Sequence, residues 1–417
     1  MKESKIRLAI ICGGRSTEHE VSACSARNVY DAVDKSKYDV TLILVEKFGG
    51  WKLLHSAAEL KETPGVQEPE TSLPAVQSSV TRESEMLQTI ASSAVERGLD
   101  VVFPLIHGAF GEDGCLQGLF RLLNIPFVGA SVLGSAIGMD KDVMKRLLNH
   151  AGIQTARFHV VTRQTARRIS FSELQDELGE CLFIKPANTG SSVGISKVMN
   201  AEQFARSLAE AFRFDEKVLV EEAILGRELE CGVIGNEEPQ ASVVGEVIVH
   251  GEFYSYEAKY VDENGAALEI PAPLSAEVSE RVRALSIAAF KVLNCVGMAR
   301  VDFFLADDGR LLVNEINTIP GFTNISMFPL LWEASGVSYS DLIDRLITLA
   351  LERHATLNEL SYEIQTDAPT VEIPEYAFRG SSALHVRQSL ALNSTLSVST
   401  FLTFLYLTGR TCSRNQE

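Results

Sequence analysis

The segment that decides the fold is RVDFFLADDGRLLVNEINTIPG, Arg300–Gly321. Two apolar runs flank the turn at Asp307–Gly309, which predicts a β-hairpin. Side chains alternate between the two faces of a strand, so we expect Glu315 and Asn317 on one face, with Asp302 in the neighbouring strand. Carboxylate and amide oxygens suit Mg²⁺ that also touches substrate phosphates. A solvated strand end is the plainer interpretation, but carboxylates inside apolar strands are costly unless paired or metal-bound.

Outside this hairpin, apolar strand-like runs alternate with helical periodicity, which is typical of an α/β fold. The predicted strands are Ile6–Cys12, Val40–Val45, Val101–Leu105, Pro126–Val128, Leu182–Lys185, Val218–Glu221, Glu230–Ile234, Ala241–Ile248, Ala299–Leu305 and Leu311–Glu315. The predicted helices are Ser22–Val33, Cys115–Leu123, Lys141–His150 and Tyr339–His354. Residues 355–417 show no clear periodicity, and their sequence predicts no function.

Composition narrows the class of protein. The chain has 417 residues, with 38 Lys and Arg against 55 Asp and Glu, a net charge of −17. An acidic chain is a poor partner for nucleic acid or an anionic membrane surface. The 7 cysteines form no CxxC pair, which favours reduced thiols in a cytosolic protein. No apolar run has the length of a signal peptide core or a membrane span, so we expect a cytoplasmic protein.

A glycine- and serine-rich turn follows one predicted strand: KPANTGSSVG, Lys185–Gly194. Its backbone N–H groups and the lysine could hold phosphate oxygens, although a tight hairpin is the plain alternative. It is not a Walker A loop, because GxxxxGK[ST] is absent. Glu221 and Glu222 close another strand and Glu228 follows, where carboxylates could accept ribose hydroxyls or be surface charge.

Two further loops lie at expected strand ends near the N-terminus. GGRSTEHEVS, Gly13–Ser22, lacks the GxGxxG of a dinucleotide fold, and Glu18 could be a helix-capping residue. HGAFGEDG, His107–Gly114, is a glycine-rich loop at the carboxyl end of a strand, where open α/β sheets bind ligands. A lone histidine there is more often structural than catalytic.

Taken in order, these segments resemble the D-alanine–D-alanine ligases of the ATP-grasp superfamily, from about residue 5 to about residue 354. The motifs that carry the resemblance are GGRSTEHEVS, HGAFGEDG, GMDKDVMK, KPANTGSSVG, EEAILGRELE, FYSYEAKY and NEINTIPGFTNIS. The resemblance implies a doubly wound (pre-ATP-grasp) domain at 1–140, followed by a two-part ATP-grasp module at 141–222 and 223–354. Residues 355–417 form an atypical tail: a dispensable extension, an oligomer contact or a reading-frame artefact.

The resemblance also implies roles for individual residues. Those near ATP are Lys141 and Lys185 on the phosphates, Gly190 and Ser192 in the phosphate loop, Glu221 and Glu222 at the adenine hinge, Glu228 on ribose, and Lys259 in a mobile lid over 246–261. Asp302, Glu315 and Asn317 match the ligands of two Mg²⁺ or Mn²⁺ ions. The residues near D-alanine are Glu18, His107, Ser191 and Tyr260 at the first subsite, Arg300 and Gly321 as oxyanion donors, and Ser326 at the second carboxylate.

The implied reaction is ATP-dependent joining of two D-alanines through an acyl phosphate, for peptidoglycan precursor synthesis. The resemblance further implies a homodimer, and the EAKY tyrosine favours an amine as the nucleophile. Two alternatives stay open: an ATP-grasp ligase with another acceptor, and a catalytically silent nucleotide-binding protein. The first should lack Glu18, His107 and Tyr260, and the second should lack a metal ligand or an oxyanion donor; the sequence has all of them.

Overall fold

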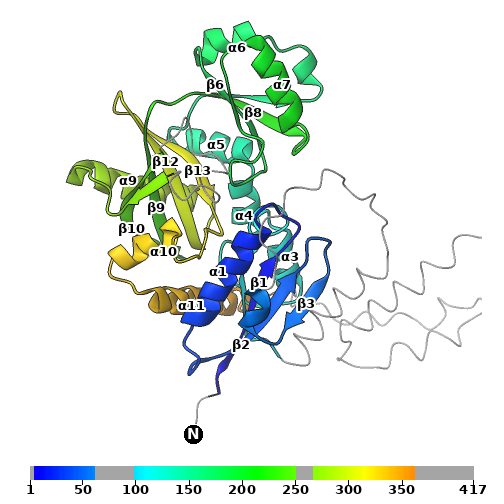
Figure 1. Cartoon of the computed structure of the whole chain (residues 1–417). Helices are drawn as coiled ribbons and strands as arrows, with labels where there is room; N and C mark the ends of the chain where they lie inside the picture. Colours follow the sequence, from blue (N-terminus) through cyan, green and yellow to red (C-terminus); the bar gives the residue numbers. More distant parts are fainter. Residues whose placement is uncertain (1–3, 62–97, 250–265, 362–417) are drawn as a thin grey trace, which may run out of the picture. The chain divides into compact units, whose positions relative to one another are not determined.

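The computed structural model describes residues 4–61, 98–249 and 266–361 of the chain. Within these residues it contains three β-sheets covered by helices, which confirms the α/β prediction (Figure 1). Lys259, Tyr260 and nearly all of the tail lie outside the described residues. Among the helices that are described, none is both long enough and apolar enough to cross a membrane.

The first sheet is doubly wound, as predicted. Its strand order is β3-β2-β1-β4, with β1, β2 and β4 parallel and β3 antiparallel at the edge. Apolar residues of β1 point alternately to both faces, so each face needs a cover. Helices α1 and α11 cover one face and α3 the other (Figure 1). The bounds are β1 Ile6–Gly13, α1 His19–Ala32, β2 Tyr38–Val45, β3 Trp51–Leu54, β4 Val101–Pro104, α3 Cys115–Leu122 and α11 Tyr339–Asn358.

The strand order indicates which edge of the first sheet is expected to bind ligands. The chain moves from β1 to β2 on one side and returns to β4 on the other, so the carboxyl ends of β1 and β4 form the switch point where open α/β sheets bind ligands. Ser22 joins these two ends: it accepts a hydrogen bond from the Gly13 amide at 2.7 Å and donates one to the Leu105 carbonyl at 2.6 Å. Both chemistry-bearing loops of this domain, at Glu18 and at His107, therefore start from one edge.

The second sheet is antiparallel, with the strand order β5-β8-β6-β7. Helices α6 and α7 pack on one face, over a core that includes Ile184, Val220 and Phe204. The bounds are β5 Phe158–Thr162, α6 Phe171–Leu178, β6 Leu182–Pro186, β7 Ser196–Val198, α7 Ala201–Ala211 and β8 Lys217–Glu222. Lys185 of β6 and Glu221 of β8 lie on the opposite face.

The third sheet is also antiparallel, in the order β11-β10-β9-β12-β13. Its strands are β9 Gly226–Gly235, β10 Gln240–Val249, β11 Ala266–Glu269, β12 Gly297–Ala306 and β13 Leu311–Asn317, and helix α9 spans Ala276–Val292. One face buries residues such as Leu229, Val301 and Phe303 against α9. Because side chains alternate, residues one position away on the same strands, Glu230 and Asp302 among them, project from the opposite face.

A register shift shapes the polar face of this sheet. Asp302 pairs with Glu315, but the next residue of β12, Phe303, pairs with Val313, so Asn314 is an extra residue in β13. Such a bulge turns its side chain out of the regular alternation. The Asn314 amide oxygen accepts a hydrogen bond from Lys185 of β6 at 3.3 Å, which links the second and third sheets.

Three helices connect these sheets. Helices α4 (Val132–Met139) and α5 (Lys141–His150) lead from the first domain to the second, and α10 (Met327–Ala334) follows β13. The sequence pattern did not predict α4, α6, α7, α9 and α10, nor the short strands β3, β5, β7 and β11. Helix α4 has apolar residues on most sides and no marked polar face, so its periodicity is weak.

Some predicted bounds need correction. Helix α1 begins at His19 rather than Ser22, and α11 continues past His354 to Asn358. The predicted strand Pro126–Val128 is only a single bridge, between Val102 and Phe127. Proline has no N–H to donate to a neighbouring strand. Arg353 of α11 donates hydrogen bonds to the carbonyls of Phe127 and Gly129 at 2.7 and 2.6 Å, so the pairing with β4 does not extend beyond one bridge.

Candidate active site

The Glu18 carboxylate lies where the first domain meets the loop of the second. Glu18 is the residue before helix α1, and its side chain is buried. The Ser191 hydroxyl donates a hydrogen bond to Glu18 Oε1. A Cβ atom added to Gly190 would lie 3.2 Å from Oε2, and one added to Gly108 would lie 3.1 Å from the same oxygen. Two glycines thus allow both loops to approach one carboxylate, and that carboxylate could hold an ammonium group.

His107 lies beside this carboxylate, buried at the end of β4. Its Nδ1 is 3.0 Å from the Ile319 carbonyl oxygen and 3.8 Å from a Glu112 carboxylate oxygen. Burial alone would lower the pKa of His107, but the hydrogen bond and charge of Glu112, with the charge of Glu18, raise it above its ordinary value. Burial raises the pKa of Glu112. Both shifts favour the protonated forms of this buried pair.

The loop that meets Glu18 has a strained backbone. Ser191 and Ser192 are consecutive non-glycine residues with φ angles of +49° and +59°. Each such left-handed residue costs on the order of 1 kcal/mol and persists where the surroundings fix it. The surroundings here are the Ser191–Glu18 hydrogen bond and the Val193 amide, which donates to the Gly190 carbonyl at 3.1 Å.

Lys141 connects this loop to the third sheet. It is the first residue of α5 and is buried, with Nζ donating to the Thr189 carbonyl at 2.7 Å and lying 3.5 Å from Glu315 Oε2. Its backbone N–H donates to the Ala187 carbonyl at 3.0 Å. Its ammonium therefore lies between the base of the Gly190–Gly194 loop and a candidate metal ligand.

Lys185 and Glu221 face the polar side of the third sheet. Lys185 Nζ is 2.8 Å from Glu221 Oε2, and Lys145 Nζ is 3.0 Å from Oε1 of the same carboxylate. Burial alone would raise the pKa of Glu221, but the two lysine charges lower it to about 2. Burial lowers the pKa of Lys145, whereas for Lys185 the Glu221 charge outweighs burial and raises it. Two lysines and one carboxylate are therefore buried together, and the positive formal charges outnumber the negative one.

Arg300 and Asp302 form an ion pair on the polar face of β12. The guanidinium donates from Nε and Nη2 to the two Asp302 oxygens at 2.8 and 2.7 Å, and Nε lies 2.8 Å from Glu230 Oε2. Burial would lower the pKa of Arg300, but Asp302 and Glu230 raise it well above its ordinary range. None of these contacts uses Nη1.

The three predicted metal ligands share one face of the β12–β13 hairpin. Asp302 is the cross-strand partner of Glu315, and Asn317 lies two residues further along β13. The Asn317 Oδ1 atom is buried and accepts no hydrogen bond from the residues that the structure describes. Among the described residues, no group of three His, Cys, Asp or Glu side chains has the arrangement of metal ligands. The candidate set is instead two carboxylates and an amide, hard oxygen donors that fit Mg²⁺, and an orphaned acceptor is what a cation would satisfy.

Gly321 and Ser326 follow β13 in a loop fixed to the first domain. A Cβ atom on Gly321 would lie 2.7 Å from the Ser326 hydroxyl, so glycine is needed for this approach. The Phe322 amide donates to Ser25 of α1 at 3.2 Å. Since His107 contacts Ile319 of the same loop, the elements around Glu18 and those around Gly321 are parts of one site.

Of the other predicted residues, Glu222 lies apart from this arrangement, whereas Glu228 is close enough for its charge to raise the pKa of Lys185. Glu222 points away from Lys185: its oxygens accept hydrogen bonds from the Arg157 amide and Nε, both at 2.8 Å. Glu228 pairs across β9 and β12 with Phe304, on the polar face of the third sheet. Lys259 and Tyr260 fall outside the described residues, so their predicted places in the lid stay untested.

Lys145 and Glu230 were not predicted as site residues from the sequence. Lys145 follows Lys141 by four residues in GMDKDVMK, a spacing that puts both lysines on one helix face. Glu230 is two residues after Glu228, which is the signal that both lie on the same face of β9. Neither signal names a partner, because the partners Glu221 and Arg300 come from distant segments.

The geometry defines a class of protein. Two antiparallel sheets meet through buried lysines and carboxylates, beside a doubly wound domain, as in an ATP-grasp ligase. Two family models match the chain: the D-ala D-ala ligase N-terminus over residues 7–130, and the D-ala D-ala ligase C-terminus over residues 147–348. The chain belongs to the D-alanine–D-alanine ligase family.

Individual relatives agree with this assignment. The D-alanine–D-alanine ligase of Shouchella clausii is 50% identical over 363 residues, 87% of this chain and 99% of that protein. The solved D-alanine–D-alanine ligase of Coxiella burnetii is 36% identical with a TM-score of 0.69, covering 85% of this chain and 97% of its own. The VanG D-Ala:D-Ser ligase of Enterococcus faecalis is 32% identical with a TM-score of 0.69, covering 83% and 100%.

Proposed function

We propose that this chain joins two D-alanine molecules into D-alanyl-D-alanine, using ATP and releasing ADP and phosphate, for peptidoglycan precursor synthesis. Residues 1–140 would hold the first D-alanine, residues 141–222 and 223–354 the nucleotide. The observation that carries the proposal is the contact of Ser191 with Glu18, which brings the phosphate loop against a buried carboxylate suited to an amino acid ammonium. A donor carboxylate held there lies beside the γ-phosphate loop.

The first half-reaction phosphorylates the carboxylate of the first D-alanine. Phosphoryl transfer depends on alignment and charge neutralisation more than on covalent help from the protein. Lys141 and Lys185 supply two ammonium groups at the mouth of the site. Glu18 would fix the substrate ammonium, and His107, held by contacts to Ser25 and to the Ile319 carbonyl, would line the same subsite.

Asp302, Glu315 and Asn317 would hold two divalent ions, Mg²⁺ or Mn²⁺. Such ions neutralise charge on the phosphates when bound. The protein's own contribution is to keep the ligands oriented: Arg300 holds the Asp302 carboxylate with both oxygens engaged, and Lys141 lies near Glu315.

The second half-reaction is attack by the amine of the second D-alanine on the acyl phosphate. Arg300, through Nη1, and the Gly321 amide would donate to the oxyanion of the tetrahedral intermediate, an effect worth about 3–4 kcal/mol per donor. Ser326, 2.7 Å from Thr323 Oγ1, would anchor the second carboxylate. Water must be excluded because acyl phosphates hydrolyse, and Lys259 and Tyr260 in the predicted lid would serve this purpose.

D-Serine is a second candidate for the acceptor, because one similar solved structure is a D-Ala:D-Ser ligase. The VanG D-Ala:D-Ser ligase matches 83% of this chain along the whole of its own length, so a protein of this fold is named for D-serine as a substrate. D-Serine and D-alanine both attack through an amine, whereas D-lactate would attack through a hydroxyl. Competition among the three acceptors, with product masses, separates these possibilities, and we expect D-alanyl-D-alanine to dominate.

The direct test is phosphate release by the purified chain with Mg-ATP, with and without D-alanine, together with the mass of the product. D-Alanine-dependent release with the dipeptide supports the proposal. ATP turnover without dipeptide contradicts it and points to another acceptor. The proposal also includes a cytoplasmic homodimer, which light scattering on the purified chain and fractionation of expressing cells would test.

A further inference from the structure

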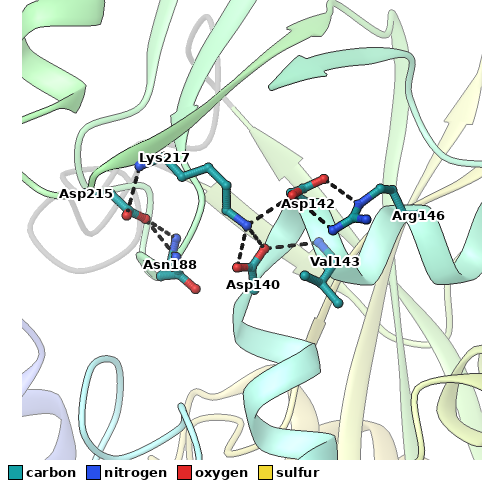
Figure 2. A network of polar contacts seen from close by, with 7 residues as sticks. All are labelled: Asp140, Asp142, Val143, Arg146, Asn188, Asp215 and Lys217. Atoms are coloured by element: carbon teal, nitrogen blue, oxygen red, sulfur yellow. Dashed lines mark hydrogen bonds and ion pairs between the residues drawn. The ribbon is translucent and has the colours of Figure 1, made fainter. Parts of the chain in front are cut away.

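Lys217, at the start of β8, bonds to the two acidic residues that flank Lys141 (Figure 2). Its Nζ lies 2.8 and 2.6 Å from the two Asp140 oxygens and 3.0 Å from Asp142 Oδ2. Neither the sequence motifs nor the reaction described above uses Lys217. Its side chain is about one-fifth exposed, and although burial would lower its pKa, the two aspartates raise it.

The two aspartates stabilise the start of helix α5 but place negative charge beside Lys141, the proposed phosphate ligand. Asp140 caps helix α5, accepting from the Val143 amide at 3.0 Å, and Asp142 is in the first turn. Such positions stabilise a helix N-terminus. Lys141 is between them, and it points its ammonium toward Thr189 and Glu315. Uncompensated carboxylates here would repel nucleotide phosphates and offer the Lys141 ammonium a competing partner.

Lys217 also joins three chain segments at the base of the Gly190–Gly194 loop. The Lys217 carbonyl accepts from the Ala187 amide at 2.9 Å, and the Ala187 carbonyl accepts from the Lys141 amide at 3.0 Å. Asp215 fixes the next residue, since its Oδ2 accepts from the Asn188 amide and Nδ2 at 2.6 and 3.0 Å (Figure 2). The start of α5, the end of β6 and the start of β8 are therefore held together.

We propose that Lys217 is a positioning residue for nucleotide binding: by occupying Asp140 and Asp142 it leaves the Lys141 ammonium for the phosphates. The inference rests on the proposed function for its phosphate subsite. Loss of the Lys217 side chain should therefore weaken the binding of ATP and leave the binding of D-alanine unchanged. The D-alanine pocket at Glu18 and His107 uses none of these contacts.

The first test compares Lys217→Met with the wild-type chain. We expect the KM for ATP to rise about tenfold or more, with the KM for D-alanine within about twofold. Affinity for a non-hydrolysable Mg-ATP analogue, measured by titration calorimetry, should fall by the same factor. Arg146→Ala is the matched control: Arg146 pairs with Asp142 at 2.9 Å from the exposed side of α5, and its loss should leave both KM values within about twofold.

A double variant separates charge from scaffolding. Asp140→Asn keeps a capping side chain, and Asp142 retains Arg146, so Asp140→Asn/Lys217→Met leaves no uncompensated carboxylate. We expect it to recover most of the nucleotide affinity, and Lys217→Arg to stay within about threefold of wild type. A merely structural role predicts no recovery. If Lys217→Met does not fold, these two variants decide: weak nucleotide binding in both, with melting temperatures near wild type, overturns the proposal.

The calorimetric readout keeps the two proposals distinct. A wild-type chain that binds the analogue but forms no dipeptide contradicts the ligase assignment while the Lys217 comparison still stands. Dipeptide formation with unchanged analogue affinity in Lys217→Met supports the ligase and overturns the role of Lys217.

Discussion

The Ser191 hydroxyl donates its hydrogen bond to Glu18 Oε1, across 173 positions of sequence. Glu18 belongs to the doubly wound domain and Ser191 to the loop that follows β6. One hydrogen bond therefore joins the candidate substrate carboxylate to the candidate phosphate loop. It also holds a loop whose two serines have left-handed backbones, so its loss should relax the loop as well as free the carboxylate.

We expect Ser191→Ala to raise the KM for D-alanine roughly tenfold and to lower kcat, because the loop no longer aligns the phosphate with the bound carboxylate. Steady-state kinetics with each substrate varied in turn measures both effects. Ser172→Ala, at an exposed serine of α6 that bonds only Ser170 among the described side chains, is the control. Equal kinetics in the two variants would show that the contact has no part in the reaction.

The first sheet and the shared face of Glu315 and Asn317 were predictable because they depend on local pattern. Alternation along β13 placed Glu315 and Asn317 on one face, and the order of strands and helices in the first domain predicted its doubly wound sheet. The bulge at Asn314 was not predictable, since an extra residue in a strand leaves no mark in the apolar pattern. That bulge is what gives Lys185 its partner on the third sheet.

Glu221 gives a prediction about acid stability. Its folded pKa of about 2 lies below its ordinary value of 4.5, so it stays ionised more readily in the folded chain. Its stabilising contribution is fully present above about pH 4.5 and is lost as the pH falls toward 2. We expect Glu221→Gln to lower the free energy of unfolding by about 3–5 kcal/mol at pH 7, because two buried lysines lose their counter-charge.

Urea unfolding between pH 7 and pH 3 measures this effect, and the difference between wild type and variant should shrink on the acid side. Adding Lys145→Met to Glu221→Gln removes one of the stranded charges, so the double variant should be more stable than Glu221→Gln alone. A Glu221→Gln chain as stable as wild type at pH 7 would mean that the ion pairs make no net contribution.

The partners of buried charges were the main thing that sequence could not supply. Lys145 carries the spacing of a site residue, yet its role depends on Glu221, which lies on another element. His107 looked like a lone histidine; its pairing with Glu112 and Ile319 follows only from how two loops meet. Sequence pattern fixes which face a residue occupies, whereas the pairing of charges needs the packing of distant segments.

Asn317 separates metal binding from folding. Its buried Oδ1 has no hydrogen bond from the described residues, so replacing the amide by an apolar side chain of similar size removes an unsatisfied group. We expect Asn317→Leu to unfold in urea within about 1 kcal/mol of wild type, yet to lose ligase activity more than about 100-fold with weaker Mn²⁺ affinity in the presence of ATP. Loss of stability without loss of Mn²⁺ affinity would instead make Asn317 a structural residue.

The end of α11 sets where the chain can be shortened. No residue given a role in the reaction lies beyond Ser326, and α11 extends to Asn358, so a chain ending at Ser361 should keep kcat/KM for D-alanine within about twofold of the full chain. A shortened chain should still include Arg353, which binds α11 to the first domain. Its guanidinium holds two carbonyls of the segment after β4, and burial lowers its pKa to about 10.

Arg353→Met should therefore lower the free energy of unfolding by about 2–3 kcal/mol, since the carbonyls of Phe127 and Gly129 lose a charged donor in a buried place. Its KM for ATP should be unchanged, because the segment touches no candidate nucleotide residue. Urea unfolding and steady-state kinetics on the Ser361 truncation, with and without Arg353→Met, check both statements. A truncated chain that folds but has lost ligase activity would show that residues beyond 361 take part in the reaction.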